Sequence, residues 1–323
     1  MRKKKIIAIG GGTGLSTLLR GLKKYANIIN ITAIVTMMDD GGSSGRLKAE
    51  FGSLPPGDIR NCILALTDKE DILTKIFNYR FPITKKKPYV GGHSLGNLLM
   101  LALADIYGGF EKAIKKISEI LSIKGKVLPI TLQQAQLVAV LEDGKKSFGE
   151  TKISKSQKPI KRLMLKPSKV LHYPEVIDEL LTADMIVVGP GSLFTSILPN
   201  LIIEEVCDVV SKSHAKKVYV CNIMTQPGET DNYTVADHIK KIYEHCKNKF
   251  IFDYVIINSG KIPKDILKYY ALENAYPVKI DDMNVLKNLT RNILKGTFVK
   301  IDKSEKLIRH DPNKLAKVIL KIL

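Results

Sequence analysis

Apolar runs that end in glycine-rich loops and lead into helical patterns recur along this chain. The first run, Lys5 to Ile9, precedes the loop Gly10 to Gly14, and leucines then follow at helical spacing. Three further pairs of run and loop repeat this plan: Ile31 to Met37 with Asp39 to Gly45, Asp184 to Val188 with Gly189 to Ser192, and Lys217 to Ile223 with Thr225 to Thr230. Near-continuous apolar strands are typical of parallel sheets covered on both faces. The pattern therefore predicts an α/β fold, with a doubly wound, mainly parallel sheet and helices on both faces.

Between the second and third of these units, the periodicity predicts helices over Pro56 to Asp68, Ser94 to Tyr107 and Phe110 to Ile123. Ser94 is a suitable N-cap for the second helix, and the pair Gly108-Gly109 is suited to end it. We expect these helices to surround one end of the sheet.

The stretch from Leu128 to Pro167 has a different pattern, in which short alternating runs flank the turn Glu142-Asp143-Gly144. This pattern predicts a hairpin. We therefore expect a small β-rich insertion around residues 125–170 within a single domain over residues 1–323, since there is no internal repeat, linker or low-complexity segment. The pattern of the C-terminal part of the sequence predicts three elements: a strand at Tyr254 to Asn258, a helix through Tyr270, and a terminal helix capped at Asp311.

The composition, with 45% apolar and 26% charged residues, is that of a globular protein. The apolar run Ile6 to Ile9 is too short for a signal peptide, and the longest apolar stretch, Leu98 to Ala104, is too short to span a bilayer. The 4 cysteines (Cys62, Cys207, Cys221 and Cys246) lie far apart without a C-x-x-C pair, which predicts free thiols in a reducing compartment. We therefore expect a cytoplasmic protein with no membrane segment.

The net charge of +19 indicates an acidic partner, because such a field attracts anions. Nucleic acid has to be considered for that reason. However, the lysines are spread over the whole chain, and the sequence has no tryptophan and no RNP-type or helix-turn-helix motif. The sequence thus favours a small anionic ligand and a solvated lysine-rich surface over nucleic-acid binding.

The first glycine-rich loop, Gly10 to Gly14, lies where a strand passes into a helix, so backbone N–H groups and the positive helix end converge there. A phosphate is the natural occupant, because glycines allow close approach to the backbone. The ligand-binding candidates are Gly11, Gly12, Thr13 and Gly14. Leu15 stands where a dinucleotide fingerprint has its third glycine, which argues against an NAD-dependent dehydrogenase. A tight turn without a ligand is the alternative.

The second loop, Asp39 to Arg46, combines two carboxylates, two hydroxyls and an arginine. Asp39 and Asp40 could accept sugar hydroxyls, or hold Mg²⁺ beside a diphosphate. The hydroxyls and the arginine could bind phosphate oxygens. The candidates of this loop are Asp40, Gly41, Gly42, Ser43, Ser44 and Arg46. An ordinary Asp-Gly turn, with Asp39 as a helix cap, is the alternative.

Two more polar segments, Pro55 to Asn61 and Gly91 to Asn97, add the candidates Asp58, Asn61, His93 and Asn97. Asp58 could instead cap its own helix and pair with Arg60. His93 lies in a polar glycine-rich turn and could donate to a phosphate or move a proton, with a structural hydrogen bond as the alternative. If the protein catalyses a reaction, the candidates are Asp39, Asp40 and His93. His238 and His245 are expected on a solvated helix face rather than at a metal.

The fourth loop, Gly189 to Ser196, again follows a buried strand and opens a helix. Its candidates are Gly191, Ser192 and Thr195. Loops at the carboxyl ends of parallel strands should meet in one crevice at the topological switch point of the sheet. We therefore expect these segments to build a single ligand site.

Taken in order, the loops resemble the family that includes the gluconeogenesis factor YvcK and the 2-phospho-L-lactate transferase CofD, and the YvcK branch in particular. The similar stretches are Ala8 to Leu22, Thr32 to Leu47, Pro55 to Asn61, Gly91 to Leu98, Val188 to Leu201 and Val220 to Thr230. They are long and lie across nearly the full chain.

The resemblance implies a modified Rossmann-like sheet, a homodimer, and a UDP-sugar ligand such as UDP-N-acetylglucosamine. It also implies a regulatory role in gluconeogenic carbon metabolism and cell-shape morphogenesis, with a regulatory protein as a possible partner. By the same resemblance, Tyr270 and Arg309 would contact the nucleotide sugar; Tyr270 could stack on a ring, and Arg309 could clamp a diphosphate. An exposed helix tyrosine and a surface salt bridge are the alternatives.

Two functions follow as hypotheses. The first is a UDP-sugar sensor that requires no cofactor. The second is a transferase of the 2-phospho-L-lactate type that uses a guanosine nucleotide, with Mg²⁺ held by Asp39 and Asp40. The second loop keeps these two acids but continues as Gly-Gly-Ser-Ser-Gly, and no deazaflavin-binding feature is recognisable, which favours the sensor.

Overall fold

The computed structural model describes residues 2–83, 90–156, 158–302 and 304–323. Its centre is a seven-stranded parallel sheet with the order β10-β9-β8-β7-β1-β2-β3. The strands are β1 (Lys4–Gly10), β2 (Ile29–Val35), β3 (Lys126–Pro129), β7 (Met185–Val188), β8 (Lys216–Val220), β9 (Phe252–Asn258) and β10 (Thr290–Gly296). Counted in chain order within the sheet, this is the Rossmann order 3-2-1-4-5-6 with one further edge strand. The predicted fold class is confirmed.

The central strands are apolar because helices cover both of their faces. The side chains of Ile6 to Ile9 in β1 and of Met185 to Val188 in β7 have 0% exposed surface. A strand with two buried faces needs no polar alternation, so its sequence reads as an unbroken apolar run. The four predicted strand positions are confirmed, with ends that differ by a few residues.

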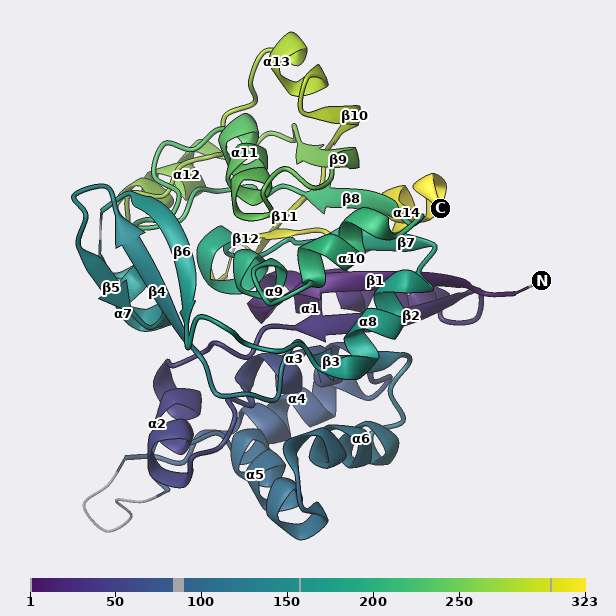
Figure 1. Cartoon of the computed structure of the whole chain (residues 1–323), viewed down its shortest axis with the longest axis vertical. Helices are drawn as coiled ribbons and strands as arrows, with labels where there is room; N and C mark the ends of the chain where they lie inside the picture. The colour runs from purple at the N-terminus through teal and green to yellow at the C-terminus, as the bar shows by residue number, and fades with distance from the viewer. Residues whose placement is uncertain (1, 84–89, 157, 303) are drawn as a thin grey trace.

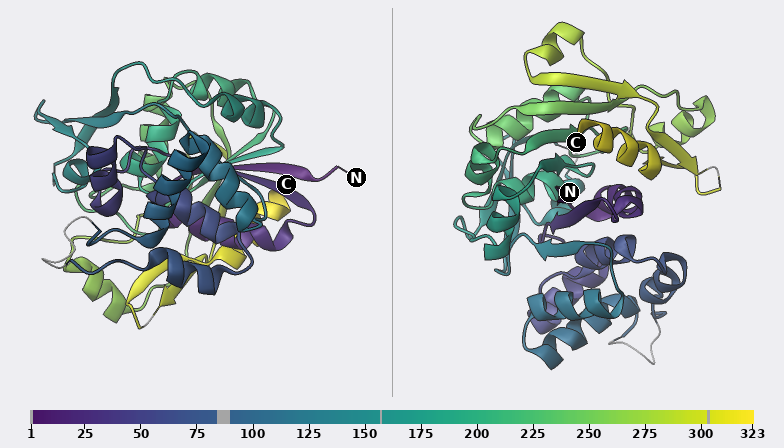
Figure 2. Two further views of the ribbon diagram at one scale, coloured as in Figure 1. Left: turned by 90° about the horizontal axis from the view of Figure 1, so that it is seen from below. Right: turned by 90° about the vertical axis from the view of Figure 1, so that its right-hand side faces the viewer.

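Helices pack on the two faces of the sheet (Figure 2, right). Behind the sheet in Figure 1, α1 (Gly12–Leu22) packs against α3 (Gly57–Leu66) and α14 (Pro312–Ile322). In front of it lie α8 (Pro174–Leu181), α9 (Leu198–Leu201), α10 (Val206–Lys212) and α11 (Val235–His245). The sheet is therefore doubly wound, as the sequence predicts.

A further group of helices lies beyond the β3 edge, in the lower part of Figure 1. It consists of α2 (Gly42–Phe51), α4 (Glu70–Asn78), α5 (Leu95–Tyr107) and α6 (Phe110–Ile120). Ser94 accepts a hydrogen bond from the backbone N–H of Asn97, and Gly108 ends α5 in a left-handed conformation. Both predicted caps of α5 are confirmed.

The inserted segment forms a three-stranded antiparallel sheet in the order β5-β4-β6. Its elements are β4 (Gln136–Leu141), β5 (Lys146–Phe148), α7 (Glu150–Ser154) and β6 (Ile160–Lys166). The hairpin turn contains Gly144 at φ +80°, a conformation that favours glycine. The predicted hairpin is confirmed, whereas the short helix α7 was not foreseen.

The C-terminal part contains elements that the sequence pattern did not indicate. They are the edge strand β10, the hairpin of β11 (Val299–Asp302) and β12 (Leu307–His310), and α13 (Met283–Lys287). The predicted strand and helices correspond to β9, α12 (Lys264–Ala271) and α14, which is capped by Asp311. Short one-turn elements follow α1 (Lys23–Tyr25) and precede α9 (Leu193–Ile197).

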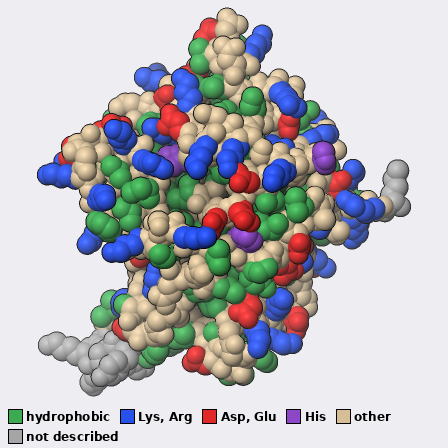
Figure 3. Space-filling view, viewed as in Figure 1, with side chains coloured by type: hydrophobic (Ala, Val, Ile, Leu, Met, Phe, Trp, Pro, Cys, Tyr) green, Lys and Arg blue, Asp and Glu red, His purple; other side chains and the backbone are tan. Residues whose placement is uncertain are grey.

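Lys and Arg side chains are scattered over the face that Figure 3 shows, with acidic side chains among them. Within the described ranges, none of the helices is both long and apolar enough to cross a membrane.

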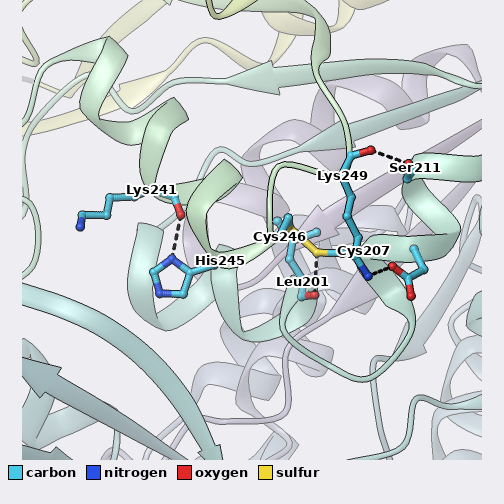
Figure 4. Close-up of a disulfide and its surroundings, with 8 residues drawn as sticks. Leu201, Cys207, Ser211, Lys241, His245, Cys246 and Lys249 are labelled. Atoms are coloured by element: carbon cyan, nitrogen blue, oxygen red, sulfur yellow. Dashed lines mark hydrogen bonds and ion pairs between the residues drawn. A yellow bond between two sulfur atoms is a disulfide. The ribbon is translucent and has the colours of Figure 1, made fainter.

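The prediction of four free thiols is wrong, because Cys207 and Cys246 form a disulfide (Figure 4). Their Cα atoms are 5.6 Å apart although 39 positions separate them in the chain. Cys207 lies in α10, and Cys246 directly follows α11. The fold brings these two places together, and sequence spacing cannot show it. Cys62 and Cys221 are free and buried.

The prediction that His238 and His245 face solvent is also wrong. His238 has 0% exposed surface, and its Nδ1 lies 2.8 Å from the carbonyl oxygen of Thr234. The Nε2 of His245 accepts a hydrogen bond from the backbone N–H of Leu163 at 2.9 Å, so this ring connects α11 to β6. Both rings lie on the packed side of α11 because the insertion and the loops before the helix cover it.

Candidate functional site

The first glycine-rich loop lies at the carboxyl ends of β1, β2 and β7, where the strand order reverses. A Cβ atom at Gly11 would lie 2.6 Å from Oδ2 of Asp58 and 2.7 Å from Cγ2 of Thr36. A Cβ atom at Gly14 would overlap the carbonyl oxygen of Pro190. Only glycine permits these approaches, so the first loop contacts both the start of α3 and the fourth loop.

Asp58 lies in the first turn of α3, and its carboxyl group reaches the start of α1. Its carboxyl group accepts a hydrogen bond from the backbone N–H of Gly12. Gly11, the N-cap of α1, provides no side-chain cap, and the first turn of α1 contains no acidic residue. The positive end of α1 therefore meets a carboxyl group from the segment Pro55 to Asn61. The sequence alone could not indicate this contact.

The second loop is held by its own aspartates. Oδ1 of Asp39 accepts from the backbone N–H of Gly41 at 2.8 Å, as the alternative of an Asp-Gly turn requires. Oδ1 of Asp40 accepts from the backbone N–H and the hydroxyl of Thr151, at 2.9 and 2.8 Å. A Cβ atom at Gly149 would overlap Oδ2 of Asp40. Asp40 thus fixes α7 of the insertion against the loop.

A buried polar network lies behind the second loop. The hydroxyl of Ser43 is 3.0 Å from Nδ1 of His93 and accepts from Nδ2 of Asn97 at 3.1 Å. Arg60 donates to Ser94 and, at 2.8 Å, to Oδ1 of Asn97. His93 is 1% exposed, and burial together with Arg46 lowers its pKa, so its ring is neutral near pH 7. This geometry matches the alternative of a structural hydrogen bond for His93, and Asn97 belongs to the same network.

Other candidates of these segments have separate contacts. The guanidinium of Arg46 lies over Gly92, where a Cβ atom would be 2.6 Å from Nη2. The Nη2 of Arg60 donates to Oδ1 of Asn61 at 3.1 Å, so Arg60 binds amides and hydroxyls instead of pairing with Asp58. Ser44 is buried, Gly12 and Gly42 adopt positive φ, and Thr13 is exposed at the start of α1.

The fourth loop is anchored by Asn222 and Glu229. Gly191 exchanges two hydrogen bonds with the side chain of Asn222, at 3.1 and 2.8 Å. The carboxyl group of Glu229 accepts from Ser192, from Thr195 at 3.3 Å, and from Ser154 of α7 at 2.8 Å. Glu229 therefore joins the fourth loop to the insertion, as Asp40 joins the second.

The carboxyl groups around these loops repel one another. Burial, with the nearby Asp39 charge, raises the pKa of Asp58 to about 7, and burial together with Asp39 and Asp58 raises the pKa of Glu150 to about 9. Burial also raises the pKa of Glu229. Lys48 lies beside Asp40 and Asp39, although burial lowers its pKa. Near neutral pH Glu150 therefore holds a proton and Asp58 is partly protonated, which limits the negative charge of the crevice.

The carboxylates do not form a complete metal site. In the part of the chain that the structure describes, no group of three or more His, Cys, Asp and Glu side chains is arranged to hold a metal ion. Oδ1 of Asp39 and Oδ1 of Asp40 are already used as acceptors. Protein ligands alone therefore do not provide a Mg²⁺ cage here.

Tyr270 and Arg309 both contact Ile308, and their hydrogen bonds in the described residues do not involve the glycine-rich loops. The hydroxyl of Tyr270 accepts from the backbone N–H of Ile308 at 2.8 Å. Arg309 is exposed and donates to the carbonyl of Ile308 at 3.1 Å. Tyr270 lies in α12 and Arg309 in β12, and β12 packs against α1, the helix that follows the first loop. Sequence reasoning did not name Glu150, Thr151, Asn222 and Glu229 as candidates, although Glu229 lies in the loop Thr225 to Thr230, because their contacts with the other loops arise only in the folded chain.

The strand order and the meeting of glycine-rich turns at the switch point define a Rossmann-like α/β protein. The family model described as 2-phospho-L-lactate transferase CofD matches residues 6–299. The chain belongs to this CofD/YvcK family.

Relatives named gluconeogenesis factor match essentially the full chain. The one from Bacillus subtilis (strain 168) is 45% identical over 322 residues, which cover 100% of this chain and 99% of the relative. The one from Listeria innocua is 41% identical over 321 residues, covering 99% and 96%. A crystal structure of a protein from Bacillus halodurans superimposes with a TM-score of 0.93 at 42% identity, covering 99% of this chain and 100% of the other. These relatives support a place in the YvcK branch of the family.

The contact between Gly149 and Asp40 can be tested with a matched pair of variants. Gly149 has φ +86° and Gly144 has φ +80°, but a Cβ atom at Gly144 would meet nothing within 4 Å. Gly149→Ala should therefore cost about 1–3 kcal/mol more than Gly144→Ala, because only the first displaces Asp40 from Thr151. Urea unfolding of both variants measures the difference, and equal losses would contradict the proposed contact.

The raised pKa of Asp58, about 7, predicts a pH dependence of stability. The folded chain binds this proton more tightly than the unfolded chain does, so the stability it adds at low pH is lost as the pH rises toward about 7. Asp58→Asn keeps a neutral acceptor for Gly12. It should reduce the fall in stability between pH 5 and 8, and be roughly 1–2 kcal/mol more stable than the parent at pH 8.

Urea unfolding at both pH values checks this prediction. Asp105→Asn, on the exposed side of α5, serves as the control and should follow the parent. An Asp58→Asn variant that keeps the parent's pH dependence would show that Asp58 is not the group concerned.

Proposed function

We propose that this protein is a regulatory UDP-sugar-binding protein, with UDP-N-acetylglucosamine as the type of ligand, that acts in gluconeogenic carbon metabolism and cell-shape morphogenesis. The carrying observation is the close approach of the first and fourth loops at Gly14, together with that of the second loop to the start of α3 at Gly57. Rossmann-like sheets bind nucleotides in this crevice.

Two helix ends supply suitable phosphate contacts. α1 and α2 begin after Gly11 and Gly41, and neither helix has a side-chain cap or an acidic residue in its first turn. The backbone N–H groups and positive ends of these helices favour a diphosphate. Asp58, now at the start of α1, would have to share or yield this place when the ligand binds, and its tendency to hold a proton near neutral pH eases that exchange.

Polar side chains around the crevice suit a sugar nucleotide. Asp39, Asp58 and Glu150 are partly exposed and could accept hydrogen bonds from the hydroxyl groups of a ribose or sugar. We include Tyr270 and Arg309 as contacts for the base and diphosphate, since β12 packs against α1. A homodimer and a regulatory protein partner form part of the same proposal.

A Mg²⁺-dependent transferase of the 2-phospho-L-lactate type, using a guanosine nucleotide, is the second candidate. The family model that matches residues 6–299 favours it. Since the described side chains offer no metal cage, Mg²⁺ would be held by Asp39 and Asp40 only together with the phosphates of the ligand. Under this function, Asp40→Asn abolishes Mg²⁺-dependent product formation.

A thermal-shift panel with UDP-N-acetylglucosamine, UDP-glucose, GTP and NAD, each with and without Mg²⁺, distinguishes the candidates. We expect a shift with UDP-sugars only, of a size that corresponds to about 2.7 kcal/mol at a hundred times the dissociation constant. A shift confined to GTP with Mg²⁺ would favour the transferase. The sensor proposal fails if no UDP-sugar shifts the midpoint at millimolar concentration.

The variant Gly42→Ala tests whether the ligand binds at the start of α2. Gly42 has φ +47°, and a Cβ atom there would meet nothing within 4 Å, so the methyl group extends into open space at the start of α2. We expect the UDP-sugar dissociation constant to rise about tenfold, because the methyl group obstructs approach to the backbone. Gly108→Ala is the control, since it also has positive φ (+70°) and open space but caps the far end of α5. Isothermal titration calorimetry measures both, and equal affinities would place the ligand elsewhere.

A further inference from the structure

A cavity with a volume of about 520 Å³ lies at the edge of the sheet opposite the glycine-rich loops. Lys216 and Lys217 begin β8, Asp253 is the second residue of β9, and Arg291 is the second residue of β10. In Figure 1 the strands start on the side where N is marked and end on the side where α7 lies. The length of β8 at about 3.3 Å per residue separates the cavity from the crevice by roughly 15 Å.

Basic groups dominate the lining of this cavity. They are His214, Lys216, Lys217, Lys249 and Arg291. Among the described lining residues Asp253 is the one carboxylate, and it already accepts from the backbone N–H of Lys217 at 2.8 Å and from Arg291 at 2.9 Å. Lys249 pairs with Asp208, and Lys216 donates to the carbonyl oxygen of Ile322, so the positive charge of the cavity is only partly balanced.

Lys217 shows this imbalance most clearly. It is half-buried, and its Nζ donates to the carbonyl oxygens of Ser213 and Ala215, at 2.8 and 3.3 Å, and not to a carboxylate. Burial lowers the pKa of Lys217; the charge of Asp253 opposes this shift, and that of Arg291 adds to it. An anionic ligand would therefore stabilise the charged form of Lys217.

The rest of the wall suits a small molecule. Ala215 and Phe250 provide buried apolar surface, and Ser211 and Ser213 provide hydroxyl groups. Ser211 donates to the carbonyl oxygen of Lys249, which fixes the loop after α11 beside α10 (Figure 4). The volume lies within the usual range for small-molecule sites, about 300–1,000 Å³.

A second cavity of about 1290 Å³, between β6 and the helices α10 and α11, has a different character. Its described lining includes as many acidic groups (Glu142, Glu204, Glu205, Asp208 and Glu244) as lysines and arginines (Lys161, Arg162, Lys241, Lys247 and Lys249). Acidic and basic side chains are likewise interspersed on the face in Figure 3. The excess of positive charge thus belongs to the smaller cavity.

We propose that the cavity at the amino ends of β8, β9 and β10 is a second ligand site, which binds a small molecule with two or more phosphate or carboxylate groups. The anionic groups lie between Lys217 and Arg291, with His214 and Lys216 beside them. This site is distinct from the glycine-rich crevice. The proposal does not depend on whether a UDP-sugar binds in that crevice.

Inorganic pyrophosphate and citrate are the probes, titrated calorimetrically into the full chain at constant ionic strength. We expect saturable binding that Lys217→Gln and Arg291→Gln each weaken about tenfold, because each removes one charged contact. Lys317→Gln, an equal charge change on the exposed side of α14, should leave the affinity unchanged. Arg291 is 73% exposed, so its variant should fold even if loss of the Lys217 contacts lowers stability.

Two measurements separate this site from others. Hydrogen exchange with pyrophosphate should show protection in residues 211–217 and 249–253, and the binding step that Arg291→Gln weakens should remain in Gly42→Ala. Binding that Gly42→Ala abolishes and Arg291→Gln leaves intact would move the probe to the crevice and overturn the proposal. Equal affinities in Arg291→Gln and Lys317→Gln, no binding at millimolar probe, or binding only to a single-stranded oligonucleotide with steep salt dependence would overturn it as well.

Discussion

The close approach of backbone at the switch point between β1 and β7 is the constraint on which the rest of the site depends. Gly14 lies against the carbonyl of Pro190, and Gly11 lies against Asp58 and Thr36, with no room for a Cβ atom. The first loop contacts the fourth loop and the start of α3, and Gly57 of α3 lies against Ser44 and Asp39 of the second loop, so these segments meet in one place. A side chain at either glycine would separate the segments that the parallel sheet aligns.

Buried carboxyl groups hold the crevice together and also determine its charge. Asp40 and Glu229 each join a glycine-rich loop to α7, so the insertion is fixed over the carboxyl ends of the strands. Asp58 and Glu150 are crowded by the same acids, and their raised pKa values keep them at least partly protonated near neutral pH. The burial of several acids in a small volume thus both holds the insertion in place and keeps the negative charge of the crevice low.

The two ends of the sheet have opposite characters. The carboxyl ends of the strands carry glycines, hydroxyls and acids, whereas the amino ends of β8 to β10 carry lysines and an arginine with one carboxylate in the described lining. A parallel sheet gives each loop set its own edge, so residues far apart in sequence gather at one end or the other. The basic side chains that give the net charge of +19 are therefore not evenly distributed between these two ends of the sheet.

The sequence by itself determined the sheet, its parallel strands and the glycine-rich loops, because buried strands and tight turns leave local patterns such as Lys5 to Ile9 and Gly10 to Gly14. It also indicated the hairpin at Gly144 and the caps at Ser94 and Asp311 for the same reason. Only the tertiary structure decided which polar side chains meet. Glu150 and Glu229 come to the crevice, Cys207 meets Cys246, and His238 is buried. These contacts join segments separated by tens of residues, and no local pattern encodes them, because they depend on how the helices and the insertion pack on the finished sheet.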